Sequence, residues 1–127
     1  FIEIDSPLWN ISCFYLITTG GNQQKLVIKK PIFISSCRMF LSEEKASCII
    51  NDNCMMSMDV VIMPTDGHPI FDTTNNQRIN QIKSAVEIGK NVWVGMGAFI
   101  GKNTKIPDNT IIGARSVVTG DRIKWGG

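Results

Sequence analysis

Residues 88–117 consist of five six-residue units: Ile88-Gly-Lys-Asn-Val-Trp, Val94-Gly-Met-Gly-Ala-Phe, Ile100-Gly-Lys-Asn-Thr-Lys, Ile106-Pro-Asp-Asn-Thr-Ile and Ile112-Gly-Ala-Arg-Ser-Val. The first position is always Ile or Val, the second is usually Gly, and the fifth is always small. A period of six fits neither an amphipathic helix nor a simple strand, whose periods are shorter. It predicts a short strand and a turn, repeated with the same residue facing inward, which is typical of a β-helix solenoid.

The turn positions of the unit carry residues suited to unusual backbone angles. We expect Gly at the second position to supply the backbone freedom that the turn requires. Asn at the fourth position tolerates left-handed conformations. The β-branched first residue is then expected to stack on its counterparts in neighbouring coils.

A second six-residue series lies upstream at Ile50, Met56 and Ile62, with Cys54 and Val60 at fifth positions. It is out of phase with the series that starts at Ile88, so the coil is interrupted between the two. The interruption, residues 63–81, is rich in Pro, Gly, Asn and Thr, which predicts a loop. Long loops in compact repeats are often functional.

The N-terminal part lacks the six-residue pattern. Residues 11–19 and 25–30, joined through Gly20-Gly21-Asn22, are predicted to form a hairpin. We interpret residues 1–31 as capping strands of one domain and residues 32–127 as its β-helix, because solenoids need covered ends.

Composition limits the class of protein. The 127 residues suit a single domain, 43% are apolar, and no apolar run is long enough to span a bilayer. The net charge of +2 is too small to indicate nucleic-acid binding. With four cysteines, no CxxC pair and one histidine, a zinc site is not expected; the cysteines are interpreted as reduced core residues. The sequence begins with Phe1 and not with Met, so we expect that part of the natural N-terminus is missing.

The motifs Asp66-Gly-His-Pro-Ile, Ile88-Gly-Lys-Asn-Val-Trp-Val-Gly and Ile112-Gly-Ala-Arg-Ser-Val-Val-Thr together resemble the hexapeptide-repeat acyltransferases. The resemblance covers roughly residues 48–121 and is greatest to the sugar O-acetyltransferases of the galactoside/maltose group and of bacterial surface polysaccharides. It implies an all-β, left-handed parallel β-helix with three hexads per coil and an extruded loop around residues 63–81. It also implies a homotrimer with sites between subunits, acetyl-CoA as donor and a sugar as acceptor.

His68 is the only histidine of the chain. An ordinary imidazole titrates near pH 6.5 and can accept a proton from a hydroxyl at neutral pH. His68 matches the catalytic His of the family and is predicted to be the general base; the alternative is an incidental loop histidine. Asp66 and Asp72 are near enough in sequence to fix its tautomer, or are turn-forming aspartates. We take Asp66 as the candidate partner.

The resemblance also implies roles for residues of the repeats. Trp93 matches a family Trp that helps to shape the acceptor and acetyl pocket, and it occupies an outward position that needs cover. Contacts to coenzyme A are carried over to Met96, Ala114, Thr119 and Gly120. Gly120 replaces the family Lys, so we expect Arg115, Arg122 or Lys124 to contact the phosphates instead. Family members usually continue beyond Val-Val-Thr over the nucleotide, whereas this sequence ends at Gly127, so either a segment is missing or the nucleotide is held differently.

The predicted function is therefore acetyl-CoA-dependent O-acetylation of a sugar or bacterial surface polysaccharide in the cytoplasm, without a metal. The alternatives are N-acetylation of an amino-sugar and a non-catalytic trimeric β-helix module. A γ-type carbonic anhydrase needs three histidines around zinc and is disfavoured by the single His68.

Overall fold

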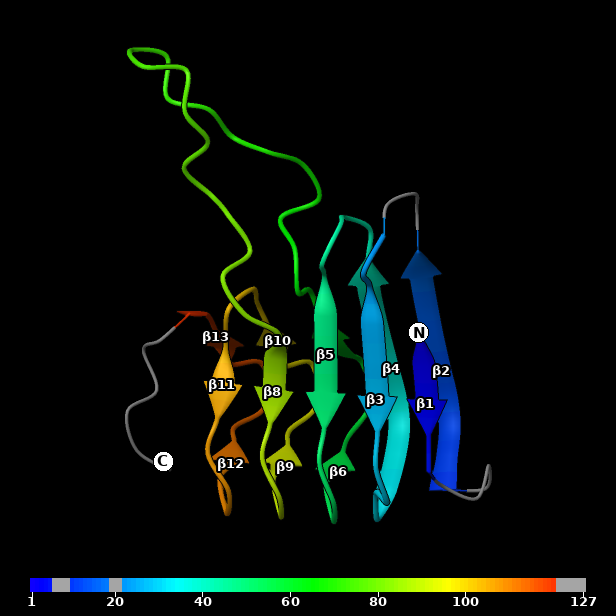
Figure 1. The fold of residues 1–127 in the computed structure, drawn as a ribbon. Coiled ribbons are helices and arrows are strands. Elements are labelled where there is room, and N and C mark those ends of the chain that lie inside the picture. The colour runs from blue at the N-terminus through cyan, green and yellow to red at the C-terminus, as the bar shows by residue number, and fades with distance from the viewer. Residues whose placement is uncertain (6–9, 19–21, 121–127) are drawn as a thin grey trace.

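The chain winds into a coil of parallel strands in the computed structural model, which describes residues 1–5, 10–18 and 22–120. One sheet forms the first face of the coil, with its strands in the order β1-β3-β5-β8-β11 (Figure 1). Each of these strands comes from a successive coil. They are β1 (Ile2–Ile4), β3 (Lys25–Ile28), β5 (Ser47–Ile50), β8 (Val86–Ile88) and β11 (Lys105–Ile106).

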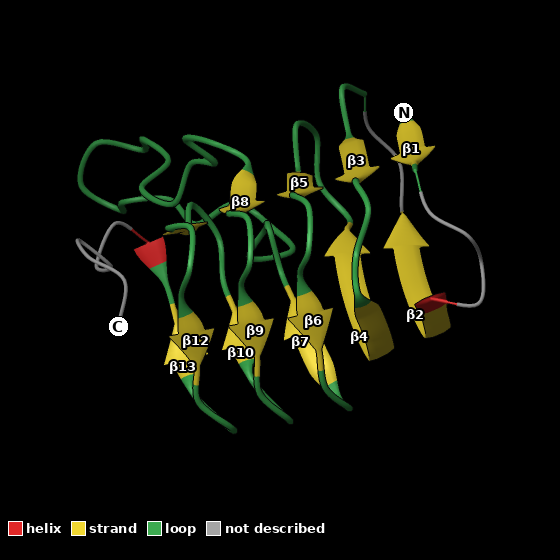
Figure 2. Ribbon diagram, turned by 90° about the horizontal axis from the view of Figure 1, so that it is seen from below, coloured by secondary structure: helices red, strands yellow, loops and turns green. Residues whose placement is uncertain are grey.

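A second sheet folds along one long strand into the two other faces. The start of β4 (Phe33–Leu41) pairs with β6, and its later residues pair with β7. The second face continues through β9 and β12, and the third through β10 and β13, as Figure 2 shows from below. β2 (Ile11–Thr18) pairs along β4. The short strands are β6 (Met55–Met56), β7 (Val60–Ile62), β9 (Trp93–Val94), β10 (Phe99–Ile100), β12 (Ile111–Ile112) and β13 (Val117–Val118).

The strand register confirms three hexads per coil. Glu87 pairs with Lys105, which holds the same place three hexads later, and Phe99 pairs with Val117 in the same way. In Figure 1 the coils follow one another from right to left, the strands of the front sheet run downward, and the chain returns upward behind them. This sense of winding is left-handed. Paired residues are normally one coil apart in the sequence, but Ile49 and Glu87, which pair across the loop, are more than two coils apart. The loop therefore inserts slightly more sequence than one full coil contains. Because the insertion is not a whole number of hexads, the two hexad series are out of phase.

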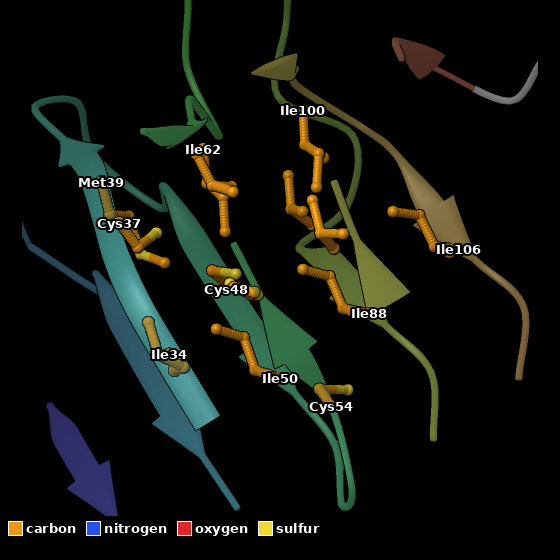
Figure 3. Close-up of a cluster of buried hydrophobic side chains, with 14 of the residues drawn as sticks. Ile34, Cys37, Met39, Cys48, Ile50, Cys54, Ile62, Ile88, Ile100 and Ile106 are labelled. Carbon is orange, nitrogen blue, oxygen red and sulfur yellow. The ribbon is translucent and has the colours of Figure 1, made fainter. Parts of the chain in front are cut away.

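The interior is filled by the first and fifth positions of the hexads, as the sequence predicts. Ile50, Ile88 and Ile106 stack on the first face, and equivalent stacks line the other two (Figure 3). Cys48 and Cys54 are fully buried at fifth positions. The cysteines are free thiols; Cys13 is exposed, and burial raises the pKa of Cys37 to about 12. The inward stacking of uniform apolar residues provides the core.

The corners of the coil confirm one prediction about turn chemistry and correct another. The fourth position of each hexad has a left-handed backbone, with φ between 56° and 72°. Asn or Asp occupies most of these positions, as expected for residues that tolerate this conformation. They are Asn53, Asp59, Asn91, Gly97, Asn103, Asn109 and Arg115.

The predicted reason for Gly at the second position is wrong. Gly89, Gly95 and Gly101 do not have left-handed φ values. Instead, the next coil approaches them closely: a Cβ on Gly95 would lie 2.6 Å from the backbone N of Ala114. The second position is therefore small because of packing between coils, not because of turn geometry.

The predicted N-terminal hairpin is also wrong. β2 pairs in parallel with β4, and β3 pairs in parallel with β1 and β5. The two segments thus lie on different faces of the coil. Their coils are longer than three hexads, since Lys25 pairs with Ser47 and Ile11 with Ile34. The longer turns hide the six-residue period in this part of the sequence.

Close packing between coils predicts different effects for two glycines at the same hexad position. Gly95→Ala should destabilise the fold by about 1–3 kcal/mol, because the new methyl group meets backbone atoms of the next coil. Gly113→Ala should cost less than about 1 kcal/mol, because its nearest neighbour would be the Ser116 hydroxyl at 3.4 Å. Urea unfolding of both variants measures the difference. Equal losses would contradict packing as the reason for these glycines.

Candidate active site

The segment between β7 and β8 rises away from the corner where the third face meets the first (Figure 1). Its outer part closes on itself, because Phe71 and Arg78 form an antiparallel bridge and the N–H of Ile79 donates to the carbonyl of Ile70. His68 lies exposed near the start of this closed part. A loop built this way presents its side chains outside the coil while both ends remain fixed in the strands.

The imidazole of His68 has a defined hydrogen-bond partner. Its Nδ1 lies 3.2 Å from the carbonyl oxygen of Pro69. A carbonyl oxygen can only accept, so this contact is a hydrogen bond when Nδ1 carries the ring proton. In a neutral ring, Nε2 then holds the lone pair. The exposed nitrogen is therefore the one able to accept a proton from a substrate.

Asp66 lies two residues before His68, but its contacts are with other groups. Its Oδ2 accepts hydrogen bonds from Lys102 Nζ at 2.5 Å and from Asn80 Nδ2 at 3.0 Å. The hydrogen bond from Lys102 lowers the pKa of Asp66 most; burial opposes it, and the bond from Asn80 adds to it. Asp66 thus ties the base of the loop to Lys102, which follows β10, while the ring of His68 contacts Pro69 instead.

Asn80 is the buried centre of the loop, with 8% of its surface exposed. Its Nδ2 donates to Asp66 Oδ2 and to the carbonyl of His68, both at 3.0 Å. Its Oδ1 accepts from the N–H of Ile70 at 2.8 Å and from Arg78 Nε at 3.0 Å. One side chain therefore holds the backbone on both sides of Pro69.

A second anchor joins the loop to the turn after β4. Glu43 forms an ion pair with Arg78 and accepts a hydrogen bond from the buried Thr65 hydroxyl at 2.5 Å. Partial burial acts to raise the pKa of Glu43, but the hydrogen bonds from Thr65 and Arg78 outweigh it and lower the pKa. The carboxylate is thus charged at neutral pH and holds both ends of the loop.

Sequence reasoning missed Asn80, Glu43, Arg78 and Lys102. Asn80 has the same residue type as Asn75 and Asn76 nearby, and Glu43 is far from Arg78 in the sequence. Asp72, by contrast, forms the expected turn: its Oδ1 accepts from the N–H of Thr74 at 2.8 Å. Hydrogen bonds from Thr74 lower the pKa of Asp72.

Trp93 lies on a different side of the coil from His68. It is 46% exposed on β9, and its Nε1 donates to Ser57 Oγ at 3.4 Å. In Figure 1 the loop rises above the coil, whereas β9 lies along its lower side. A single chain therefore does not bring Trp93 to His68.

An outward apolar row crosses the second face beside Trp93. Phe33, Met55, Trp93 and Ile111 are aligned by strand register. A groove of about 410 Å³ opens next to them and includes Met58 and Met96 in its lining. Phe33, Trp93, Ile111, Met58 and Met96 are all exposed, so the second face carries an apolar patch.

The residues predicted to contact coenzyme A fall at two corners of the coil. Met96 and Arg115 meet where the second face turns into the third, since the N–H of Arg115 donates to the carbonyl of Met96 at 2.8 Å. Ala114 lies at the same corner. Thr119 lines a cleft of about 270 Å³ with Asp66 and Lys102, and the N–H of Gly120 donates to the carbonyl of Lys102. Arg122 and Lys124 lie outside the described residues.

Residues 1–5, 10–18 and 22–120 contain no group of three or more His, Cys, Asp or Glu side chains arranged to hold a metal. Within the same residues there is no helix with the length and apolarity that crossing a bilayer requires.

The sequence of this chain is similar to those of known transferases. Residues 85–120 match the bacterial transferase hexapeptide family with six repeats. The chain is 38% identical over 78 residues to a polysialic acid O-acetyltransferase of Escherichia coli O1:K1 / APEC, covering 61% of this chain and 25% of that protein. It is 35% identical over 72 residues to the galactoside O-acetyltransferase of Escherichia coli (strain K12), covering 57% and 34%.

A third relative, a polysialic acid O-acetyltransferase of Neisseria meningitidis, is 39% identical over 57 residues, covering 45% of this chain and 26% of the relative. The crystal structure of the polySia specific acetyltransferase NeuO overlaps 94% of this chain and 74% of its own, with 21% identity and a TM-score of 0.47. The sequence is thus similar to a hexapeptide-repeat transferase family over residues 85–120 and to these O-acetyltransferases over about half of the chain. It spans about a third or less of the length of these curated relatives.

The two carboxylate anchors predict that acid releases the loop. Because the pKa of Asp66 and of Glu43 is lower than usual, their anchoring is complete at neutral pH. It is lost as the pH falls below about 4, through the lowered values of the folded chain. NMR amide shifts of Gly67 and Ile70 should change in that range, before those of Glu87 in β8. Asp66→Asn should show a looser loop already at pH 7. Loop and strand amides that change together would contradict this order.

Proposed function

We propose that the chain is an acetyl-CoA-dependent O-acetyltransferase that acylates a hydroxyl of a sugar or bacterial surface polysaccharide. The observation that carries this proposal is the state of His68: one exposed imidazole on an anchored loop, with Nδ1 bound to Pro69 and Nε2 available. The hexapeptide coil and the O-acetyltransferase relatives support the reaction class.

The proposed reaction uses His68 as general base. Nε2 takes the proton of the acceptor hydroxyl while its oxygen attacks the carbonyl carbon of the thioester, forming the new C–O bond. The tetrahedral intermediate then collapses, the C–S bond breaks, and the leaving sulfur receives the proton from the imidazolium. The products are the acetyl ester and free coenzyme A, and the imidazole is neutral again. Asp66 acts in this scheme by fixing the loop that carries His68.

The donor is proposed to contact the two corners that border β13. Met96 and Ala114 would offer backbone groups to the pantetheine arm, with Arg115 beside them, and Thr119 and Gly120 would lie at the other corner. Arg115 and Lys124 are the candidate contacts for the phosphates, where a cation is required. We also propose a cytoplasmic location for the chain. The use of acetyl-CoA as donor supports this location, and so do the free thiols of the cysteines.

A homotrimer would account for the separation of Trp93 from His68. In that arrangement the loop of one subunit would meet the second face of its neighbour, and Trp93 would complete the acceptor and acetyl pocket. The outward row of Phe33, Met55, Trp93 and Ile111 supports this, because three of these apolar side chains are exposed in one chain and the half-buried Met55 joins Phe33 to Trp93.

Replacement of the base should lower turnover without loss of donor binding. We expect His68→Gln to lower kcat by about 10²–10⁴-fold, the usual contribution of a general base. Calorimetric titration with acetyl-CoA should give the same affinity as the unaltered chain, and Thr73→Ala, in the same loop, is the control. Full activity in His68→Gln would overturn the proposed role.

The alternative functions need two other measurements. Activity assays with paired acceptors, one with a hydroxyl and one with an amino group, separate O-transfer from N-transfer. An intact trimer that binds no acetyl-CoA would favour the non-catalytic alternative.

The assembly is tested by placing a charge in the apolar row. Ile111, on the second face, is 63% exposed, and Val117, at the same hexad position on the third face, is 74% exposed. Ile111→Lys should lower the mass in solution from trimer to monomer, because burying an unpaired ammonium is costly. Val117→Lys should leave the mass unchanged. Light scattering on both variants decides, and a trimeric Ile111→Lys protein would exclude this face as the interface.

A further inference from the structure

The side chain of Asn80 uses its complete hydrogen-bonding capacity inside the loop. A carboxamide has two N–H donors and two acceptor lone pairs. Both donors of Asn80 point to acceptors, the carboxylate of Asp66 and the carbonyl of His68. Both lone pairs meet donors, the N–H of Ile70 and the guanidinium of Arg78. The orientation of the amide is therefore fixed by chemistry, and no other natural side chain of this size offers the same set.

The bond to Ile70 has a consequence for the neighbouring peptide. The N–H of Ile70 and the C=O of Pro69 belong to one planar trans peptide, so they point in opposite directions. Asn80 Oδ1 binds the N–H at 2.8 Å and so directs the carbonyl away from itself. That carbonyl is the oxygen that lies 3.2 Å from His68 Nδ1. Asn80 also holds the carbonyl of His68, on the other side of Pro69.

Pro69 makes this arrangement more rigid. Its ring fixes φ, and the peptide between His68 and Pro69 has no N–H that could compete for Asn80. The two peptides that flank Pro69 therefore carry two carbonyls and one N–H. Asn80 binds the carbonyl of His68 and the N–H of Ile70, and the carbonyl of Pro69 lies against His68 Nδ1.

We propose that Asn80 is the positioning residue that selects the tautomer of His68, acting through the peptide between Pro69 and Ile70. Without a directed acceptor at Nδ1, the imidazole of histidine in water holds its proton mainly on Nε2. In that form the exposed nitrogen is a donor and cannot take a proton from a hydroxyl. The link from Asn80 to catalysis rests on the proposed function, but its effect on the tautomer does not.

The single histidine makes the test direct. In the untagged chain labelled with ¹⁵N-histidine, only His68 contributes imidazole signals. At about pH 9, where an ordinary imidazole is neutral, the ¹⁵N shifts report which nitrogen carries the proton. We expect the proton on Nδ1 in the unaltered chain. A spectrum with the proton on Nε2 would overturn the proposal before any variant is made.

Two substitutions distinguish the effect of the acceptor oxygen of the Asn80 side chain from that of its N–H donors. Asn80→Ala removes both and should shift the proton to Nε2. Asn80→Asp keeps an oxygen for the N–H of Ile70 and should retain the Nδ1 proton. Lys102→Met is the control for general loosening, because it breaks the ion pair with Asp66 and the hydrogen bond to the backbone carbonyl of Asn80 but leaves the bond to Ile70. The proposal fails if Asn80→Ala keeps the Nδ1 proton, or if Asn80→Asp or Lys102→Met loses it as fully as Asn80→Ala.

Kinetics give an independent reading. Asn80→Ala should lower kcat by about tenfold or more, the equivalent of one lost hydrogen bond, with an unchanged KM for acetyl-CoA. A raised KM with unchanged kcat would instead assign Asn80 to donor binding. If the chain transfers acetyl to no acceptor, the proposed function fails, and the ¹⁵N spectra still decide on the tautomer.

Discussion

Every feature of this molecule depends on the parallel hydrogen bonding of one coil to the next. Backbone groups pair at a repeat of three hexads, as between Glu87 and Lys105, and this pairing fixes which side chains face inward. Ile and Val stack in the interior, and at the glycines the next coil lies so close that a Cβ atom would clash with it. The left-handed backbone at Asn91, Asn103 and Asn109 turns each corner. A change to the repeat would therefore disturb all three faces together.

The same constraint explains how an insertion is tolerated. The loop adds more than a full coil of sequence between β7 and β8, yet Ile49 still pairs with Glu87, so the coil resumes in register. The insertion lies at a corner, where the chain leaves one sheet and enters another and no ladder is broken. Loop closure costs free energy that grows only slowly with length. The coil can thus carry a long segment outside its core without losing its own hydrogen bonds.

The coil could be predicted from the sequence because residues of the same type recur with the period of the coil. Ile, Val and small residues recur every six positions, and the phase change between Ile62 and Ile88 revealed the loop. The anchors of the loop could not be predicted in this way. Glu43 and Arg78 meet only because the coil brings the turn after β4 beside the loop, and Asn80 differs from its neighbours only in being buried. The glycines were predicted correctly in position but for the wrong reason, because close approach between coils does not show in a single unit.

The anchoring of the loop differs in kind from the packing of the coil. Apolar stacking is non-directional, and it would hold a loop in place without fixing the direction of a particular carbonyl. Hydrogen bonds are directional, and the loop uses them at Asp66, Asn80 and Thr65. The side chain that needs orientation, His68, lies two residues from Asp66 and makes its own bond to Pro69. A proton acceptor must present one nitrogen and not the other, and only directional contacts can enforce that choice. The polar network is therefore the part of the structure on which the proposed role of His68 as a base depends, and the apolar coil is the support that holds the network's distant members together.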